Sequence, residues 1–396
     1  MKGCLFSKFY YFLLVLLQIN IIYIDLATAN NKSVIDKPAQ ALRFNAGDLQ
    51  ASGTPIFQLN IVAVGDILLH KPLHVQALQK KEGHKSLWSN VLDVLKGADM
   101  TYGNLEGPVA KGITISGKSV KDPGDEFDNF VYTSFPRFNY HEELISDLVE
   151  SGFDVVSTAN NHALDRGSIG VDKTIEALQS AQLQFTGTRT RNDSLSEIED
   201  WATIIVRNGF RIAWLACTFS TNGLADPYHQ VLDCYRDTKS IQNIINKLSM
   251  AAKIDAVIVT PHTGIEYMDA PEKRAISLYR SFIDSGALAV FGAHPHVLQP
   301  WERYLTKEGK EGFIIYSLGN FVSGQFQKVK TRASILLSLK LKKTQLSKAQ
   351  IAEVNYIPLE MVRSSGNYQV LTIDQDSGTK AIFEHIVRMF GFENKL

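Results

Sequence analysis

The sequence has no surplus of either charge and very little cysteine, and each shortage excludes a class of protein. Its 41 Lys and Arg residues balance 41 Asp and Glu residues, and no basic run is interleaved with aromatic residues. Proteins that bind nucleic acid normally carry such a basic patch, so we expect no nucleic-acid partner. Only 3 of the 396 residues are cysteine, too few for a small disulfide scaffold.

Three widespread catalytic signatures are also missing. The sequence contains no GxSxG nucleophile elbow, no GxxxxGK[ST] phosphate loop and no GxGxxG dinucleotide fingerprint. Serine-hydrolase, P-loop and dinucleotide-binding functions therefore have no support. The hydrophobic fraction of 45% and the charged fraction of 21% are ordinary globular values, which excludes disordered and fibrous classes.

The first 29 residues have the pattern of a secretory signal peptide. Lys2 and Lys8 precede an apolar run over 9–24, and Ala27-Thr28-Ala29 then supplies a cleavage site of small residues. The run is shorter than the roughly 20 residues that a membrane-spanning helix needs. We expect cleavage after Ala29 and an extracytoplasmic location, periplasmic or secreted. An uncleaved membrane anchor is the alternative.

The rest of the chain divides by its pattern into three parts. Residues 30–55 are polar and aperiodic, as in a linker. Residues 56–325 alternate strand-like apolar runs with segments of helical period, which predicts a layered α/β domain; these segments are 87–97, 140–152, 170–182, 239–253 and 271–286. Residues 326–396 alternate like half-exposed strands and end in a short helix near 378–390, which predicts a small β-rich appendage.

Two features of the main domain stay open at this stage. The segment 110–139 is long and rich in Gly, Lys and Asp, and is either a substrate-side flap or a plain surface insertion. Cys217 and Cys234 remain after signal-peptide cleavage, and they either form a disulfide or stay as buried free thiols.

Five apolar stretches end at polar residues of types that bind metal ions. In α/β sheets, ligands bind beyond the carboxyl ends of the strands, so we expect these side chains to share one rim. A mixed set of carboxylate, amide and imidazole donors suits a transition metal such as Mn, Fe or Zn. The candidate ligands are Asp66, Glu106, Asn161, His262, His294 and His296.

Each of these residues also has an ordinary structural interpretation. Asp after Gly is a common turn pair, and Asn at a strand end often just closes the strand. The two histidines of the His-Pro-His segment reach one centre only if the chain bends there, because alternate residues of an extended segment point to opposite sides. His162 is a candidate catalytic residue, with Asp165 placed to orient its ring, and His70 remains a candidate ligand.

Taken in order, the motifs GD, GNLEG, NNHALD, PHTGIE, GAHPHV and YSLGNF resemble those of the bacterial capsule-synthesis protein CapA family, associated with poly-γ-glutamate synthesis. The resemblance covers roughly residues 59–325. It implies a branch of the calcineurin-like metallophosphoesterases, with a four-layer αββα sandwich and a two-metal centre. By position, Glu106 then resembles the bridging carboxylate, and His162 the histidine that protonates or steadies the leaving group.

The sequence departs from the phosphoesterase pattern at two places. Leu68 stands where those enzymes have a histidine, two residues after the first aspartate, and GNLEG replaces their GDxxD. One metal position is thus a ligand short, and we expect one or two divalent ions.

The resulting functional hypothesis is an extracytoplasmic metal-dependent hydrolase. Its substrate would be a phosphoester or an amide of a glutamate polymer, and its partners would belong to a membrane-bound capsule synthesis complex. The alternative is a non-enzymatic component that binds or exports an anionic capsule polymer.

The signal-peptide prediction is tested by N-terminal sequencing of exported protein. The mature chain should begin near Asn30, because the small residues before it form the cleavage site. Exported protein that retains Met1 would contradict the prediction.

Overall fold

The structure is a computed structural model, and it describes residues 42–44, 56–193 and 201–392. The expected signal peptide, 1–29, and most of the expected linker, 30–55, lie outside these residues. Among the described residues, no helix is both long enough and apolar enough to cross a membrane.

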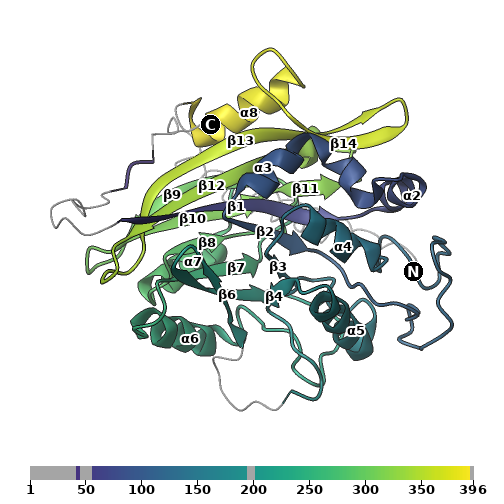
Figure 1. Cartoon of the computed structure of the whole chain (residues 1–396), viewed down its shortest axis with the longest axis horizontal. Helices are drawn as coiled ribbons and strands as arrows, with labels where there is room; N and C mark the ends of the chain where they lie inside the picture. The colour runs from purple at the N-terminus through teal and green to yellow at the C-terminus, as the bar shows by residue number, and fades with distance from the viewer. Residues whose placement is uncertain (1–41, 45–55, 194–200, 393–396) are drawn as a thin grey trace, which may run out of the picture. The chain divides into compact units, whose positions relative to one another are not determined.

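The strands form two sheets. One is eight-stranded, in the order β14-β13-β12-β1-β2-β3-β4, with β11 also paired to β1; the other is six-stranded, in the order β5-β6-β7-β8-β10-β9 (Figure 1). The first contains β1 (Phe57–Leu68), β2 (Met100–Leu105), β3 (Val155–Ser157), β4 (Gln184–Thr186), β11 (Asn320–Ser323), β12 (Ala333–Lys343), β13 (Gln350–Ser364) and β14 (Asn367–Thr372). The second contains β5 (Thr203–Arg207), β6 (Phe210–Thr218), β7 (Ala256–His262), β8 (Ala289–Phe291), β9 (Leu298–Leu305) and β10 (Glu311–Leu318).

Apolar residues on both faces of the central strands hold the layers together. On β1, Leu59, Ile61 and Ala63 enter a core shared with the six-stranded sheet, whereas Val62 and Val64 face the opposite side. Successive strand side chains point to opposite faces, so a continuous apolar run can contribute to two cores at once. The same alternation along β6 and β10 divides their residues between the inter-sheet core and the helices beyond.

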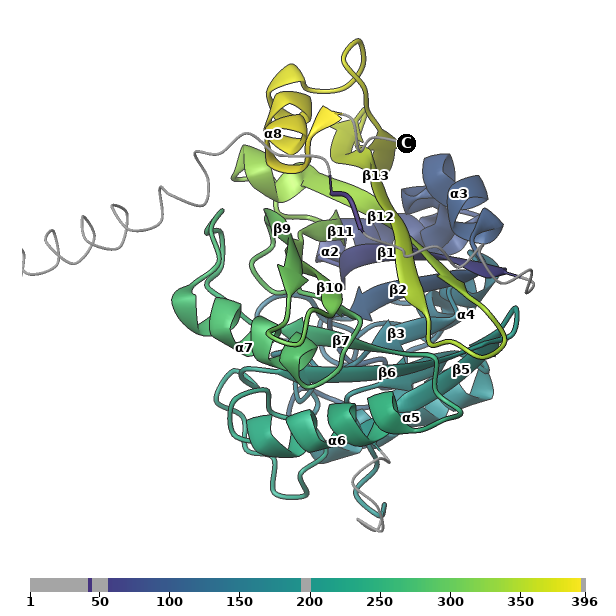
Figure 2. The ribbon, with the colours of Figure 1, turned by 90° about the vertical axis from the view of Figure 1, so that its left-hand side faces the viewer.

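Helices cover both outer faces. The eight-stranded sheet is covered by α2 (Lys71–Gln79), α3 (Leu92–Gly97), α4 (Glu143–Glu150) and α5 (Gly167–Ser180), and the six-stranded sheet by α6 (Thr238–Met250) and α7 (Lys273–Asp284) (Figure 2). The expected four-layer αββα sandwich is therefore confirmed. Helices α4 and α7 fall within their predicted segments of helical period, and α5 and α6 overlap theirs but begin earlier, at Gly167 and Thr238. The segment 87–97 is broken into a 3₁₀ turn, Ser89–Val91, followed by α3.

The C-terminal segment 326–396 is rich in β-structure, as expected, but its strands continue the main sheet instead of forming a separate appendage. β12 runs antiparallel to β1, from Phe57 opposite Lys343 to Ala63 opposite Leu337. One face of β12 enters the inter-sheet core, and the closing helix α8 (Lys380–Phe390) packs on the same core. The alternating pattern predicts the strands correctly but does not indicate their partner.

Two buried side chains order the segment 110–139: Asn139 from within it, and Arg166 from the domain. Asn139 bonds to the backbone of Ala110 and Val131, and the guanidinium of Arg166 donates to the carbonyl oxygens of Ile113 and Val131. A buried guanidinium is stabilised when its donors are paired in this way. The segment is thus fixed beside the strand ends that carry the candidate ligands.

Cys217 and Cys234 form a disulfide in the structure. Cys217 lies near the end of β6, so the bond ties the loop after this strand back to the sheet. This settles the pairing that the sequence alone leaves open.

Gly65 allows β1 to pass close to the turn before β11. A β-carbon at Gly65 would lie 1.9 Å from the carbonyl oxygen of Gly319, to which the N–H of Asp66 donates. We predict that Gly65→Ala lowers the free energy of unfolding by about 1–3 kcal/mol, because backbone must move to admit the methyl group. Urea denaturation measures the change.

The matched control is Gly97→Ala. A β-carbon at Gly97 meets nothing within 4 Å, and this residue ends α3. Its replacement should leave stability unchanged or slightly raised. Equal effects of the two substitutions would show that the close approach at Gly65 is unimportant.

Candidate metal centre

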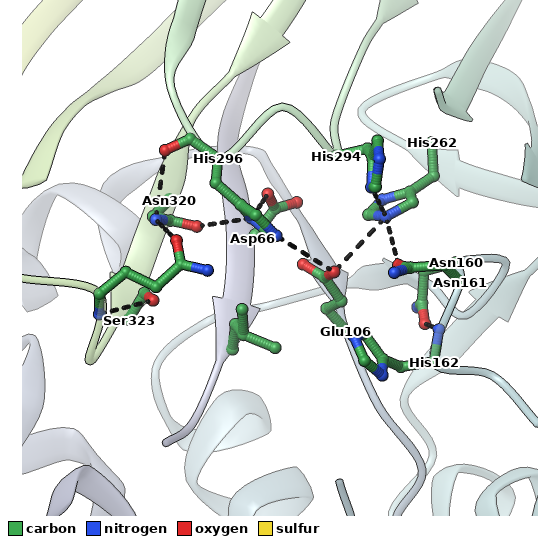
Figure 3. A network of polar contacts seen from close by, with 12 residues as sticks. Asp66, Glu106, Asn160, Asn161, His162, His262, His294, His296, Asn320 and Ser323 are labelled. Atoms are coloured by element: carbon green, nitrogen blue, oxygen red, sulfur yellow. Dashed lines mark hydrogen bonds and ion pairs between the residues drawn. The ribbon is translucent and has the colours of Figure 1, made fainter. Parts of the chain in front are cut away.

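The six candidate ligands lie together at the carboxyl ends of strands from both sheets (Figure 3). Asp66 lies near the end of β1, Glu106 directly follows β2, and His262 is the last residue of β7. The other three follow β3 or β8 in the loops, and all six side chains are buried: Asp66, Glu106, Asn161, His262, His294 and His296. The two sheets thus present their carboxyl ends to one centre.

The side chains form two groups that share Glu106. Asp66, Glu106 and His296 offer ligand atoms within 4.8 Å of one another, and so do Glu106, His262 and His294. We call these the first and second half-sites. Asn161 belongs to the second, because its Oδ1 lies 2.9 Å from Nε2 of His262. Glu106 is therefore placed to bridge two cations.

Glu106 is a buried carboxylate without hydrogen bonds. Among the described residues, neither of its oxygens has a hydrogen-bond partner, and Nε2 of His262 lies 3.5 Å from Oε1. Burial raises its pKa, but the nearby His296 and His262 outweigh burial and hold the pKa below the ordinary value. An ionised, unpaired carboxylate is expensive to bury. Divalent cations on both sides would compensate this charge, so the residues fit a dinuclear centre.

The predicted bend in the His-Pro-His segment is present. His294 and His296 have φ values of 101° and 58°, in the left-handed region that non-glycine residues rarely adopt. This conformation brings Nδ1 of His294 to 3.2 Å from Nε2 of His262, and Nδ1 of His296 to 3.1 Å from Oδ2 of Asp66. Such strain is typical of functional sites, where surrounding structure enforces it.

The two histidines of this segment have opposite electrostatic environments. Burial, together with His262 and His296, holds the pKa of His294 well below its ordinary value, which keeps that ring neutral and able to ligate. For His296, burial is outweighed by Glu106 and Asp66, which raise its pKa to about 9. A metal ion would displace this proton and take over its role in neutralising the carboxylates.

His162 and Asp165 lie beside the second half-site as a hydrogen-bonded pair. Nδ1 of His162 is 2.8 Å from Oδ2 of Asp165, and this same oxygen accepts the backbone N–H of Phe138. Burial lowers the pKa of His162, but Asp165, followed by Glu106, raises it above the ordinary value. The ring is thus held in one orientation with a proton available near neutral pH.

A pocket of ≈ 320 Å³ opens beside this pair. Its lining includes His162 and Asp165, together with Arg137 and Glu266. Glu266 belongs to neither half-site, so the structure places it at the pocket wall. Residue 137 comes from the segment 110–139, so this segment borders the pocket.

Leu68 is buried and offers no ligand atom to the first half-site. The amide of Asn320 places its Oδ1 3.1 Å from Nδ1 of His296, much as the amide of Asn161 lies beside His262. Counted in the same way, each half-site has four donor residues. His70, also a candidate from the sequence, belongs to neither half-site.

Two asparagines that the sequence interpretation missed support the ligands. Nδ2 of Asn104 lies 2.8 Å from Oδ1 of Asp66 and 3.1 Å from Nδ1 of His262, so it contacts both half-sites. Its position two residues before Glu106, on the same strand face, is a signal that could have found it. Asn222 accepts a bond from Nδ2 of Asn161, and its place in a distant loop gives no such signal.

Comparison with known proteins identifies related sequences. The capsule biosynthesis protein CapA of Bacillus anthracis is 31% identical over 273 residues, which cover 68% of this chain and 60% of that protein. The PGA biosynthesis protein CapA of Bacillus subtilis (strain 168) is 29% identical over 293 residues, 74% of this chain and 70% of that protein. The chain thus spans less than two thirds of the length of the Bacillus anthracis protein.

A solved structure with some similarity is the NAD nucleotidase of Haemophilus influenzae. It is 13% identical, with a TM-score of 0.47, over 86% of this chain and 57% of that one. Residues 60–325, which carry the whole candidate centre, match the family described as bacterial capsule synthesis protein PGA_cap. The chain belongs to this bacterial capsule synthesis protein family.

Proposed function

We propose that this protein is an extracytoplasmic metal-dependent hydrolase that cleaves phosphoesters during capsule synthesis. The observation that carries the proposal is the buried carboxylate of Glu106, which has no hydrogen bond among the described residues and lies between two sets of metal-binding donors. Bound Mn, Fe or Zn ions would supply positive charge to a phosphoryl group and lower the pKa of water to about 7. Family membership supports the link to the capsule.

His162 acts as the proton donor to the leaving group in this proposal. Asp165 binds its Nδ1, so the Nε2 side of the ring remains for the substrate. The raised pKa of His162 keeps the ring protonated at a pH where an unperturbed histidine has lost half or more of its proton. The pocket beside the pair provides the space for the leaving group.

The family link gives the proposed substrate and partners. A phosphoester fits a dinuclear centre best, and an amide of a glutamate polymer is the second choice. An anionic polymer would reach the centre past Arg137 at the pocket wall. The protein would work beside a membrane-bound capsule synthesis complex.

One observation favours a second function, namely binding or export of an anionic polymer without hydrolysis. Leu68 takes the place of a histidine ligand at the first half-site, and a weakly held cation there would weaken catalysis. Purified protein that holds metal but hydrolyses neither aryl phosphates nor glutamyl amides would support this alternative.

The shared role of Glu106 predicts an unequal loss of metal in a series of variants. Glu106→Gln should abolish binding at both half-sites, because it removes the carboxylate that both share. Asp66→Ala should remove the first cation alone, and His294→Ala the second alone. Elemental analysis of purified protein, after dialysis against metal-free buffer, measures the metal per chain.

The control for this series is His229→Ala, since His229 is exposed and lies in neither half-site. It should retain the metal content of the wild type. If Glu106→Gln also retained that content, the proposed centre would be rejected.

The role of His162 predicts a dependence on the leaving group. His162→Ala should reduce kcat about 10²- to 10⁴-fold for an alkyl phosphate, whose leaving oxygen needs a proton. The loss should be much smaller for p-nitrophenyl phosphate, whose leaving group is stable as an anion. Steady-state kinetics on both substrates, with unchanged metal content as the control, measures the difference. An equal loss on the two substrates would argue against proton donation.

A further inference from the structure

His70 is a further imidazole whose ring interacts electrostatically with residues of the centre, and neither half-site uses it as a ligand. It follows β1 and caps the start of α2, where its backbone accepts bonds from the N–H groups of Leu73 and His74. The charges of His296, Glu106 and His162 all act on its ring. The side chain is partly exposed, so a substrate can reach it.

A backbone contact fixes which nitrogen of His70 carries the proton. The N–H of Gly324 donates to Nδ1 at 3.2 Å, and a backbone N–H can only donate. Nδ1 therefore keeps its lone pair, and the proton of the neutral ring is on Nε2. The carbonyl oxygen of Leu68 lies 3.3 Å from Nδ1 and would accept a hydrogen bond from it in the other tautomer. That tautomer would set the Nδ1–H against the N–H of Gly324, which makes the shorter contact, so we assign the unprotonated Nδ1.

Glycine at position 324 makes this contact sterically feasible. A β-carbon there would lie 2.7 Å from Cβ and 3.1 Å from Cγ of His70. Any side chain at this position would push the ring away from the backbone. The absence of a side chain thus lets the backbone approach the ring.

Phe138 packs against both His70 and His162. Its ring meets that of His70 edge to face, with centroids 5.4 Å apart, and that of His162 in the same manner at 4.8 Å. One buried aromatic ring therefore holds two imidazoles, of which only His162 is bound to a carboxylate. The contrast suggests two different tasks.

The electrostatic environment keeps His70 neutral. Burial lowers its pKa to about 4, and this effect exceeds the opposing effects of the Leu68 carbonyl and of Glu106. At neutral pH the ring therefore offers one N–H donor, without a positive charge that would repel cations. Among the described residues, Nε2 has no hydrogen-bond partner, so this donor is available.

We propose that His70 donates its Nε2–H to a non-bridging oxygen of the phosphoryl group held over the first half-site. This role rests on the proposed function, and it assigns a catalytic residue that stabilises charge on the substrate. The same role gives a meaning to Leu68, which stands where the phosphoesterase pattern has a histidine ligand. In this proposal His70, two residues later, contacts the substrate instead of the metal. A protonated Nε2 cannot ligate a metal, which separates this role from ligation.

The tautomer is tested directly by ¹⁵N NMR of the full chain labelled at histidine. At pH 7, His70 should show an unprotonated Nδ1 and a protonated Nε2, with its signals assigned by their loss in His70→Gln. Gly324→Ala should alter the His70 signals, because the added methyl group displaces the ring. A protonated Nδ1 in the wild type would overturn the proposal.

The role is tested with His70→Leu, His70→Gln and the control His229→Gln. His70→Leu should keep its full metal content while losing about 10²-fold in kcat/KM on an aryl phosphate and in affinity for inorganic phosphate. His70→Gln should retain most of both, since its amide N–H can replace the donor. Loss of a metal equivalent, or unchanged phosphate affinity, in His70→Leu would overturn the proposal.

Failure of the proposed function gives a different result. If the wild-type protein binds metal and phosphate but hydrolyses no phosphoester, hydrolysis is rejected, while phosphate affinity and the NMR tautomer still decide the role of His70.

Discussion

The structure around the strand ends depends on a single buried carboxylate that lies beside imidazoles. Glu106 is fully buried, has no hydrogen bond among the described residues, and lies between the imidazoles of His262 and His296. A charge in that position requires nearby positive charge. Among the described residues, the charges that lower the pKa of Glu106 are those of histidines, and His296 has the raised pKa that this predicts. Two cations would neutralise the charge of Glu106 more completely, since both half-sites include this carboxylate.

The fold brings these side chains together from strands that are far apart in the sequence. The first half-site draws on β1, β2 and the turn after β8, and the second on β2, β7 and the loops after β3 and β8. The centre therefore joins two sheets that are otherwise held by apolar packing. Glycine at positions 65 and 324 permits two close approaches beside the centre, of β1 to the carbonyl oxygen of Gly319 and of the backbone to the side chain of His70.

The sequence predicts that the candidate ligands gather at one rim, because each follows a buried strand and the ends of parallel strands meet at one edge, and in the structure they do gather there. It also indicates that His294 and His296 can share one centre only if the chain bends between them, and the structure has this bend. It could not predict that β12 pairs with β1, since alternation indicates a strand without naming its neighbour. Nor could it place Asn222 beside Asn161, because that contact depends on the path of a loop.

The central claim is that Glu106 is shared by two cations, and anomalous X-ray diffraction from crystals grown with Mn²⁺ tests it most directly. The account predicts two anomalous peaks in contact with Glu106, one on the side of Asp66 and His296 and one on the side of His262 and His294, roughly 3.5–4 Å apart. A single peak beside Glu106, or none, would contradict the account.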